Sequence, residues 1–286
     1  MDPAVEAALI AAGVGVLTVV GTLYGTRRTS KDARNTLAEQ LTEQREQLDT
    51  TLAEQREQLD RTLAQQRDRT LNERFATAAD RVGSDKSAVQ LAGVYAMAGL
   101  ADDWPENRQT CVDVLCAYLR LPYDPDPGNG EVGWAAYRAN REVRHTIIRL
   151  IGAHLRPDVD PETSWHGLNL DFTGVVFDGG DFSFAIFSSG IIQFNGASFA
   201  SGQVDFLGAK FSGGKVYFVG AEFSGGKVYF VGAEFSGGEV YFSGAKFSGG
   251  QVDFSLPVDW SRPPVFNWLE PPEGVLLPVD ADAAPA

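Results

Sequence analysis

The sequence contains few of the side chains that build metal sites, disulfide frameworks and nucleic-acid interfaces. Two cysteines and three histidines in 286 residues exclude a disulfide framework and disfavour a Cys/His zinc site. Lys and Arg number 24 against 38 Asp and Glu, which gives a formal net charge of −14. A general nucleic-acid binder needs a basic surface that displaces counterions from the phosphates. We therefore expect no metal, no cofactor and no nucleic-acid partner.

The run from Ala7 to Tyr24 is 18 residues long and carries no charge. A helix of that length reaches about 27 Å, close to the ~30 Å hydrocarbon core of a bilayer. Arg27 and Arg28 follow the run, whereas no Lys or Arg precedes it. The positive-inside rule then predicts a single-pass helix in the cell membrane, with the N-terminus outside and the body in the cytoplasm. The alternative is a buried or interfacial helix, because alanine and glycine make the run only moderately hydrophobic.

Residues 31–72 contain no glycine or proline and are rich in Gln, Glu, Arg and Leu. The heptapeptide EQREQLD occurs at residues 43–49 and again at 54–60, shifted by eleven. Eleven residues in three turns favour a nearly straight or slightly right-handed coiled coil. We expect a stalk that forms homo-oligomers. The alternative is a solvated single helix held by its own ion pairs, here Arg45–Asp49, Arg56–Asp60 and Glu57–Arg61.

Residues 73–160 show the pattern of a small helical domain. Apolar residues at helical spacing between Val89 and Leu100 predict one helix, which also carries Tyr95 and is capped by residues 84–87. Pro105 predicts the start of a second helix, and a third is expected near Trp134–Leu155. Three or four helices in about 80 residues make a small bundle.

The cysteines and histidines of this domain lack the spacing of a reactive site. Cys111 and Cys116 are five residues apart on one helix, which favours two buried thiols over a redox pair. His145 and His154 are nine residues apart and have no third ligand in range, so we expect structural or exposed side chains.

Phenylalanine recurs from Phe172 to Phe254, first in steps of five and then in alternating steps of five and seven. The unit AEFSGGKVYFVG is therefore twelve residues long. Alternation along each short strand places the phenylalanines on one side and the charged residues and tyrosines on the other. Strands this short do not fold alone, so we expect a solenoid of stacked rungs.

A coil of 24 residues, with sides of 5, 7, 5 and 7, explains both the inward phenylalanines and the outward charged residues of the repeat. It stacks phenylalanine in four columns, with Phe206 under Phe230. About three full turns then follow a looser start near Trp165. A coil of twelve residues would stack like charges, which is unfavourable, whereas 24 residues stack opposite charges at Lys210/Glu234, Glu222/Lys246 and Lys215/Glu239.

The motifs LDFTG, VVFDG, AKFSG and AEFSG resemble the repeats of the pentapeptide-repeat family, over about 85 residues. The seven-residue steps resemble the looser, Phe-rich repeats of many actinobacterial members, which also carry an N-terminal membrane helix, a coiled coil and a small helical segment. The resemblance implies a right-handed quadrilateral β-helix and usually no catalysis. Some members resemble duplex DNA and inhibit gyrase.

No motif predicts catalysis, so we expect no catalytic, cofactor-binding or metal-binding residues and no enzyme. Gly225-Gly226-Lys227 is followed by Val228 on a predicted strand, which does not fit a phosphate-binding loop. The aspartates of the early repeats occupy polar repeat positions, and the histidines lie near no nucleophile. These residues are Asp171, Asp178, Asp181, His145, His154 and His166.

Tyr217, Tyr229 and Tyr241 share one outward register and are the candidate interaction surface. Coils of 24 residues place Tyr217 and Tyr241 on one face and Tyr229 on the opposite face. Exposed aromatic side chains can anchor a protein interface; the alternative is ordinary strand propensity. After the repeat, a Pro-rich acidic tail is expected to fold back over the last rung, through Trp260, Phe266, Trp268 and Leu269.

These segments predict an α+β chain that acts as a membrane-tethered, non-enzymatic scaffold, presenting a β-helix to an unidentified cytoplasmic protein. The alternative function is a DNA-mimicking regulator of gyrase, against which stand the tether and the modest charge of residues 170–254. A third class is a ligand-binding or catalytic role of the helical domain. The expected segments are an anchor (1–30), a stalk (31–72), a helical domain (73–160), a β-helix (161–256) and a cap with tail (257–286).

Overall fold

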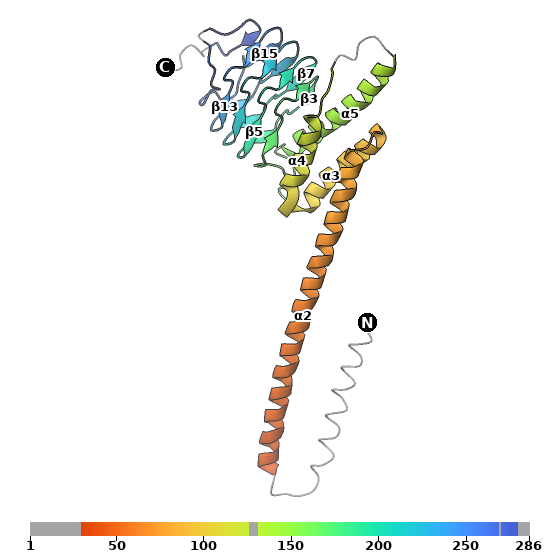
Figure 1. The fold of residues 1–286 in the computed structure, drawn as a ribbon. Coiled ribbons are helices and arrows are strands. Elements are labelled where there is room, and N and C mark those ends of the chain that lie inside the picture. Colours follow the sequence, from red (N-terminus) through yellow and green to blue (C-terminus); the bar gives the residue numbers. More distant parts are fainter. Residues whose placement is uncertain (1–29, 126–130, 269, 280–286) are drawn as a thin grey trace. The chain divides into compact units, whose positions relative to one another are not determined.

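The computed structural model describes residues 30–125, 131–268 and 270–279, and the chain divides into two units, residues 1–68 and 69–286 (Figure 1). The predicted membrane span Ala7–Tyr24 lies outside the described residues. Among the residues that are described, no helix combines the length and the apolar character that crossing a membrane requires.

Helix α2, Ser30–Val82, is a single element of 53 residues. It runs without a break through residue 72, where the stalk was expected to give way to a separate helical domain. The absence of glycine and proline explains the continuity, because neither breaker interrupts the hydrogen-bond ladder. Its last turns carry Leu71, Ala78 and Val82, which are buried in the core of the second unit.

Three further helices and one 3-10 turn follow: α3 (Ser87–Asp103), η1 (Pro105–Asn107), α4 (Arg108–Leu119) and α5 (Glu131–His154). The predicted inward positions of α4, Val112, Leu115, Cys116 and Leu119, are all buried.

The predicted side-chain cap of α3 is wrong. Its N-cap is Lys86, which makes no side-chain cap hydrogen bond. Ser84 Oγ instead accepts the N–H of Lys86 at 3.2 Å, which is the N–H of the N-cap residue and not one from the first turn of the helix. Tyr95 of the same helix is 54 % exposed, so it lies outside the core.

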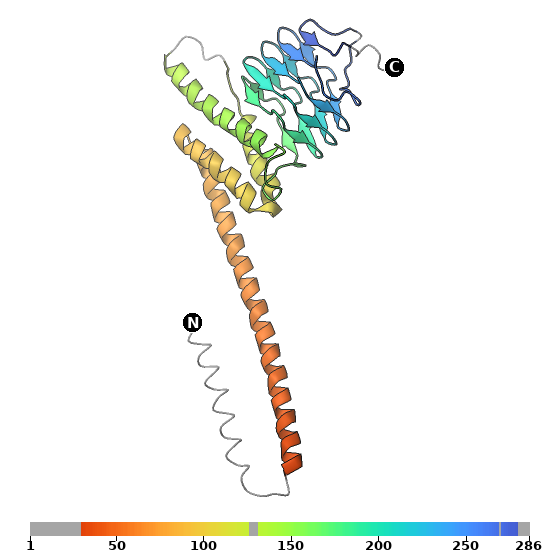
Figure 2. The same cartoon turned by 180° about the vertical axis from the view of Figure 1, so that it is seen from behind.

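Residues 170–276 form a β-solenoid with four parallel sheets, so the expected four-sided coil of about 24 residues is confirmed. Figure 2 shows the coils stacked on one another. Sheet A contains β1 (Leu170–Asp171), β5 (Ile191–Gln193), β9 (Lys215–Tyr217) and β13 (Glu239–Tyr241). Sheet B contains β2 (Val176–Phe177), β6 (Ser198–Phe199), β10 (Glu222–Phe223) and β14 (Lys246–Phe247). Sheet C contains β3 (Gly180–Asp181), β7 (Gln203–Asp205), β11 (Lys227–Tyr229), β15 (Gln251–Asp253) and β16 (Val275–Leu276); sheet D contains β4 (Ile186–Phe187), β8 (Lys210–Phe211) and β12 (Glu234–Phe235).

The interior of the solenoid is a set of phenylalanine columns. Phe206 and Phe230 are vertical neighbours, with ring centroids 4.8 Å apart and planes 6° from parallel. Such aromatic pairs contribute about 0.5–1.5 kcal/mol each beyond the burial of their area. The first coil is two residues shorter between β2 and β3, so Val176 pairs with Ser198 at a shift of 22 residues whereas Gly180 pairs with Val204 at a shift of 24. The initial steps of five therefore enter the same columns, with Phe172 stacked on Phe194 at 4.9 Å.

The exterior pairs of opposite charge also form as expected. The distances between the charged atoms are 2.9 Å for Lys210–Glu234, 3.5 Å for Lys215–Glu239 and 2.8 Å for Lys246–Glu222.

Glycine allows the coils to approach closely at the corners. A Cβ atom on Gly213 would lie 2.2 Å from the carbonyl oxygen of Ser188 in the preceding coil. At another corner the backbone takes a positive φ, as at Gly208, but Phe184 occupies the equivalent position of the first coil with φ 62°. That conformation costs a non-glycine residue about 1–2 kcal/mol.

The two ends of the solenoid are covered by different parts of the chain. Helix α5 lies against the first coil so closely that a Cβ atom on Gly152 would be 2.2 Å from Asp181 O. At the other end, Asp259 O accepts the Phe235 N–H at 2.8 Å, and the Trp260 ring stands edge-on to Phe235 at 5.1 Å. Phe266 and Trp268 continue this covering, as expected, whereas Leu269 lies outside the described residues.

Candidate functional site

The structure brings two of the three candidate tyrosines together. Tyr217 on β9 and Tyr241 on β13 are register partners in sheet A, and their rings stack at 5.5 Å and 11°. Tyr229 lies on β11 in sheet C, with Asp205 and Asp253 as its register partners. The candidate surface is therefore a tyrosine pair on one sheet and a lone tyrosine on another.

Exposed apolar side chains lie on the same coils as the tyrosine pair or on adjacent ones. Ile191 and Val219 are 40 % and 41 % exposed, and Val265, which forms a β-bridge with Tyr241, is 50 % exposed. We call Ile191, Tyr217, Val219, Tyr241 and Val265 the sheet A patch. Interface cores are typically aromatic and apolar, with charged groups at the rim.

The charged groups beside the sheet A patch are already paired with one another. Glu239 lies 3.5 Å from Lys215 Nζ and 3.1 Å from the Arg262 guanidinium. The Tyr241 hydroxyl donates to Glu239 Oε2 at 3.2 Å. This hydrogen bond, with the charge of Lys215, lowers the pKa of Glu239. Two cations share one carboxylate, so this cluster leaves one net positive charge at the edge of the patch.

Sheet C presents a different outer surface. Its outward column contains Asp181, Asp205, Tyr229 and Asp253, which are register partners in turn. Asp181 pairs with Arg156 at 2.9 Å. Three carboxylates along one column make this surface acidic, in contrast to the apolar sheet A patch.

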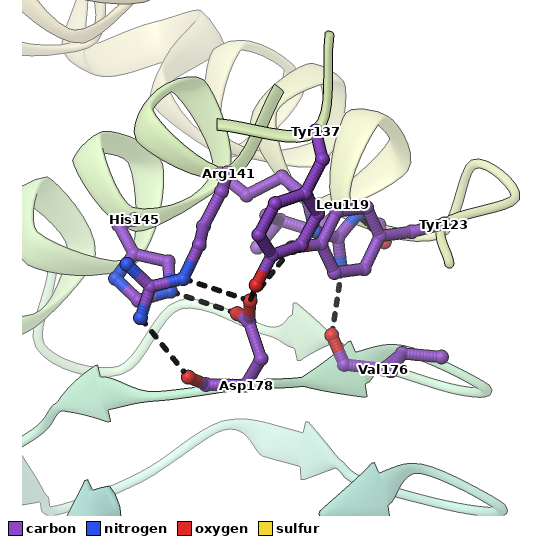
Figure 3. A network of polar contacts seen from close by, with 8 residues as sticks. Leu119, Tyr123, Tyr137, Arg141, His145, Val176 and Asp178 are labelled. Atoms are coloured by element: carbon purple, nitrogen blue, oxygen red, sulfur yellow. Dashed lines mark hydrogen bonds and ion pairs between the residues drawn. The ribbon is translucent and has the colours of Figure 1, made fainter. Parts of the chain in front are cut away.

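A second group of functional-type side chains lies where the helices meet the first coil (Figure 3). Asp178 follows β2 and is only 4 % exposed. Its Oδ2 accepts hydrogen bonds from Tyr123 at 2.7 Å, Arg141 at 2.9 Å and Tyr137 at 3.0 Å. His145 Nε2 contacts the other oxygen, Oδ1, at 2.8 Å. Four side chains from α5 and the segment before it therefore converge on one buried carboxylate.

The donors decide the ionisation of this carboxylate. Burial by itself would raise the pKa of Asp178, but hydrogen bonds from His145 and Tyr123 outweigh burial and hold the pKa well below its ordinary value of 3.8. Burial, together with the nearby Asp178 charge, raises the pKa of Tyr123. The carboxylate is thus an ionised acceptor and the phenol is a protonated donor.

Arg144 extends the same network and is 2 % exposed. Its guanidinium donates to Leu119 O at 2.7 Å and to Val176 O at 2.8 Å. It also lies over the Tyr123 ring, 4.2 Å from the centroid, in a cation–π contact. Burial lowers the pKa of Arg144 from its ordinary value, and the negative charge of Asp178 opposes this shift. We call Tyr123, Tyr137, Arg141, Arg144, His145 and Asp178 the junction network.

The junction network is suited to a structural role, which is to hold α5 against the first coil. A general base needs a free lone pair directed at substrate, whereas the oxygens of Asp178 are occupied by four donors. Sequence reasoning placed Asp178 among ordinary repeat positions and missed the network. The signal was the short step of five residues from Phe177 to Phe182, where the equivalent step of the next coil has seven, and the concentration of arginine on α5.

The remaining expected residues have structural partners. Asp171 pairs with Arg120, and His154 Nε2 contacts Asp102 at 3.2 Å. His166 Nε2 contacts Leu155 O at 2.8 Å.

The two cysteines are buried, and burial raises the pKa of Cys111 to about 11 and of Cys116 to about 12. Both are therefore poor thiolate nucleophiles.

Two shallow hollows border the helical domain, for which a ligand-binding role was the third expected class of function. One, of about 320 Å³, lies beside the junction network and is lined by Arg141, Arg149 and Gln203. The other, of about 430 Å³, lies between the end of α2 and α3 and is lined by Arg74, Arg81 and Ala96. Both are open rather than enclosed. Within the described residues no group of three or more His, Cys, Asp or Glu is arranged to hold a metal ion.

Comparison with known proteins identifies the solenoid. Residues 213–255 match the family model described as pentapeptide repeats (9 copies). This part of the solenoid therefore carries pentapeptide repeats. No curated protein and no solved structure matches the chain. Pentapeptide-repeat β-solenoids are generally non-enzymatic, and their fold suggests a role in protein interaction.

Proposed function

We propose that this pentapeptide-repeat protein is a non-enzymatic scaffold that binds a protein partner through the sheet A patch. The stacked pair Tyr217–Tyr241 carries the proposal, because its two rings and the exposed Val265 follow one another along one outward column of sheet A. Tyrosine offers a large contact area at low cost in side-chain entropy and is enriched among the residues that dominate binding energy.

The chemistry of the patch also defines the partner. Lys215 and Arg262 share the carboxylate of Glu239, so the cluster adds only one net positive charge beside the patch. An apolar or aromatic surface with few charges is the best fit. The acidic column of sheet C is a poor site for such a partner, because an apolar surface would remove the carboxylates from water at a cost in free energy.

We further propose that the scaffold is tethered to the cell membrane by Ala7–Tyr24, with the body in the cytoplasm. The uncharged run and the arginines that follow it support this orientation. The test is fractionation of cells expressing the full chain. Retention in the membrane pellet after alkaline extraction is expected, whereas a wholly soluble chain would contradict the tether.

Crosslinking in cells tests the patch. The full chain is expressed as wild type, as the Tyr217→Ala/Tyr241→Ala variant and as the matched control Tyr229→Ala. A partner that crosslinks to wild type and to the control, but at least about tenfold less to the double variant, is expected. Equal capture by all three chains would refute the patch. Substrate turnover by the purified chain would refute the non-enzymatic role.

A second candidate function is regulation of gyrase by mimicry of DNA. The column of Asp181, Asp205 and Asp253 on sheet C favours it, because spaced carboxylates can imitate phosphates. A supercoiling assay with purified gyrase separates the two candidates. Unchanged supercoiling at a large excess of the full chain removes this alternative.

A further inference from the structure

Helix α2 exposes a stripe of leucines along its stalk portion. Leucines recur every eleven residues on one side of the helix. They are strongly exposed to solvent, although leucine side chains gain free energy from burial. The exposed fractions are 46 % for Leu41, 58 % for Leu48, 41 % for Leu52, 58 % for Leu59 and 54 % for Leu63.

The threonines at the edge of the stripe would lose no hydrogen bond on burial. At about 100° per residue, Thr51 and Thr62 border the side of the helix that carries the leucines. The Thr51 hydroxyl donates to Gln47 O, and the Thr62 hydroxyl donates to Gln58 O, each at 2.8 Å. Because these hydroxyls already have partners, covering them leaves no hydrogen bond unmade.

The flanks of the stripe differ in charge. One flank carries Arg45, Asp49, Arg56 and Asp60, which form no ion pair with other described residues. Among the three ion pairs expected along the stalk, only that of Glu57 and Arg61 forms. Charge pairs of the helix itself therefore do not account for the arrangement of this flank.

The other flank carries the uncharged side chains of Gln44 and Gln55. When two such helices lie parallel and in register, the charged flank of each faces the amide flank of the other. Every leucine then meets the same leucine of the second helix, and no like charges meet across the seam.

We propose that the leucine stripe from Leu41 to Leu63 is an interface for a second copy of this chain, which packs parallel and in register. The repeat of eleven residues predicts an almost straight pair of helices. The proposal does not rest on the sheet A patch, and its tests use no other partner. Two joined copies would carry two sheet A patches, which strengthens binding through avidity where the partner is itself repeated.

Molar mass tests the interface. The purified full chain, in detergent if required, is measured by light scattering as wild type and as the Leu48→Asn/Leu52→Asn/Leu59→Asn variant. The matched control carries Glu46→Asn/Thr50→Asn/Glu54→Asn on the opposite side of the helix. Wild type and the control are expected to be oligomers, with the leucine variant dissociating at least about tenfold more readily.

The thermal unfolding of the solenoid reports folding of each variant separately, since the stripe lies outside that unit. A monomeric wild type, or a leucine variant that stays as associated as the control, would overturn the proposal.

Disulfide trapping tests the orientation. Oxidation of the Leu48→Cys variant is expected to give a covalent dimer, because parallel helices in register place the two sulfur atoms together. The Thr50→Cys variant is the control on the opposite side, and the native Cys111 and Cys116 are buried. An associated Leu48→Cys chain that does not crosslink would refute the parallel register.

Discussion

Both ends of the solenoid have to be covered, and the side chains that cover them are polar at one end and aromatic at the other. An open rung exposes backbone groups and the last layer of phenylalanine rings. At the N-terminal end the junction network supplies charged and hydroxyl donors around Asp178, and Arg144 takes the edge carbonyl of Val176. At the C-terminal end Trp260, Phe266 and Trp268 cover the rings themselves.

The difference indicates what each end must hold. The N-terminal end must orient a helix, and directional hydrogen bonds do so. At the C-terminal end the returning chain pairs its backbone with the last coil, at Asp259, Val265 and β16, and its aromatic rings exclude water. With both ends closed, the sides of the solenoid are left as surfaces for a partner.

Removing the central acceptor of the polar end should have the largest effect. The Asp178→Ala substitution leaves Arg141, His145 and two tyrosine hydroxyls without their acceptor, close to the buried Arg144. Breaking a buried network of this kind costs about 3 kcal/mol or more. Urea unfolding measures the loss.

Asp171→Ala is the matched control for that experiment. Its carboxylate pairs with Arg120 at the surface, where side chains are 37 % and 39 % exposed. An exposed pair contributes about 0–1 kcal/mol. Equal losses for the two substitutions would remove the special role assigned to Asp178.

Removing a ring from the apolar end should have a smaller effect. Trp260 is half-buried against Phe235 and Phe254, so Trp260→Ala should cost less than the 3–5 kcal/mol typical of a fully buried ring, about 2 kcal/mol. Val258→Ala is the control, because Val258 is 72 % exposed. Thermal unfolding should separate the two, and an unaffected Trp260→Ala chain would mean that the rings do not close this end.

The pH dependence of the free energy of unfolding should show the smallest difference between the two ends. The folded protein lowers the pKa of Asp178 below its ordinary 3.8, so the carboxylate stabilises the fold above that pH and this contribution is lost as the pH falls. Wild type should lose stability between about pH 5 and pH 2, and Asp178→Asn should lose less over the same range.

Trp260→Ala should keep the acid slope of wild type, because its contacts contain no titrating group. Denaturant titrations at a series of pH values provide the slopes. An unchanged slope for Asp178→Asn would contradict the ionisation described for the junction network.

The two ends also differ in how far the sequence predicts them. The coil of 24 residues can be predicted because its pattern is repeated. The phenylalanine spacing recurs in successive turns, and opposite charges such as Lys210 and Glu234 lie 24 residues apart. The aromatic cap is visible as rings beyond Phe254. The junction network is not periodic: Tyr123, Arg141 and Asp178 come from separate segments and meet only because α5 packs on the first coil.

Radical footprinting tests the central claim, that a partner binds the sheet A patch, within a single molecule. The full chain is oxidised alone and with its captured partner, and modification of the three tyrosines is compared. The account predicts that the partner slows oxidation of Tyr217 and Tyr241 several-fold and leaves Tyr229 unchanged. Protection of Tyr229 with no change at Tyr217 and Tyr241 would contradict it.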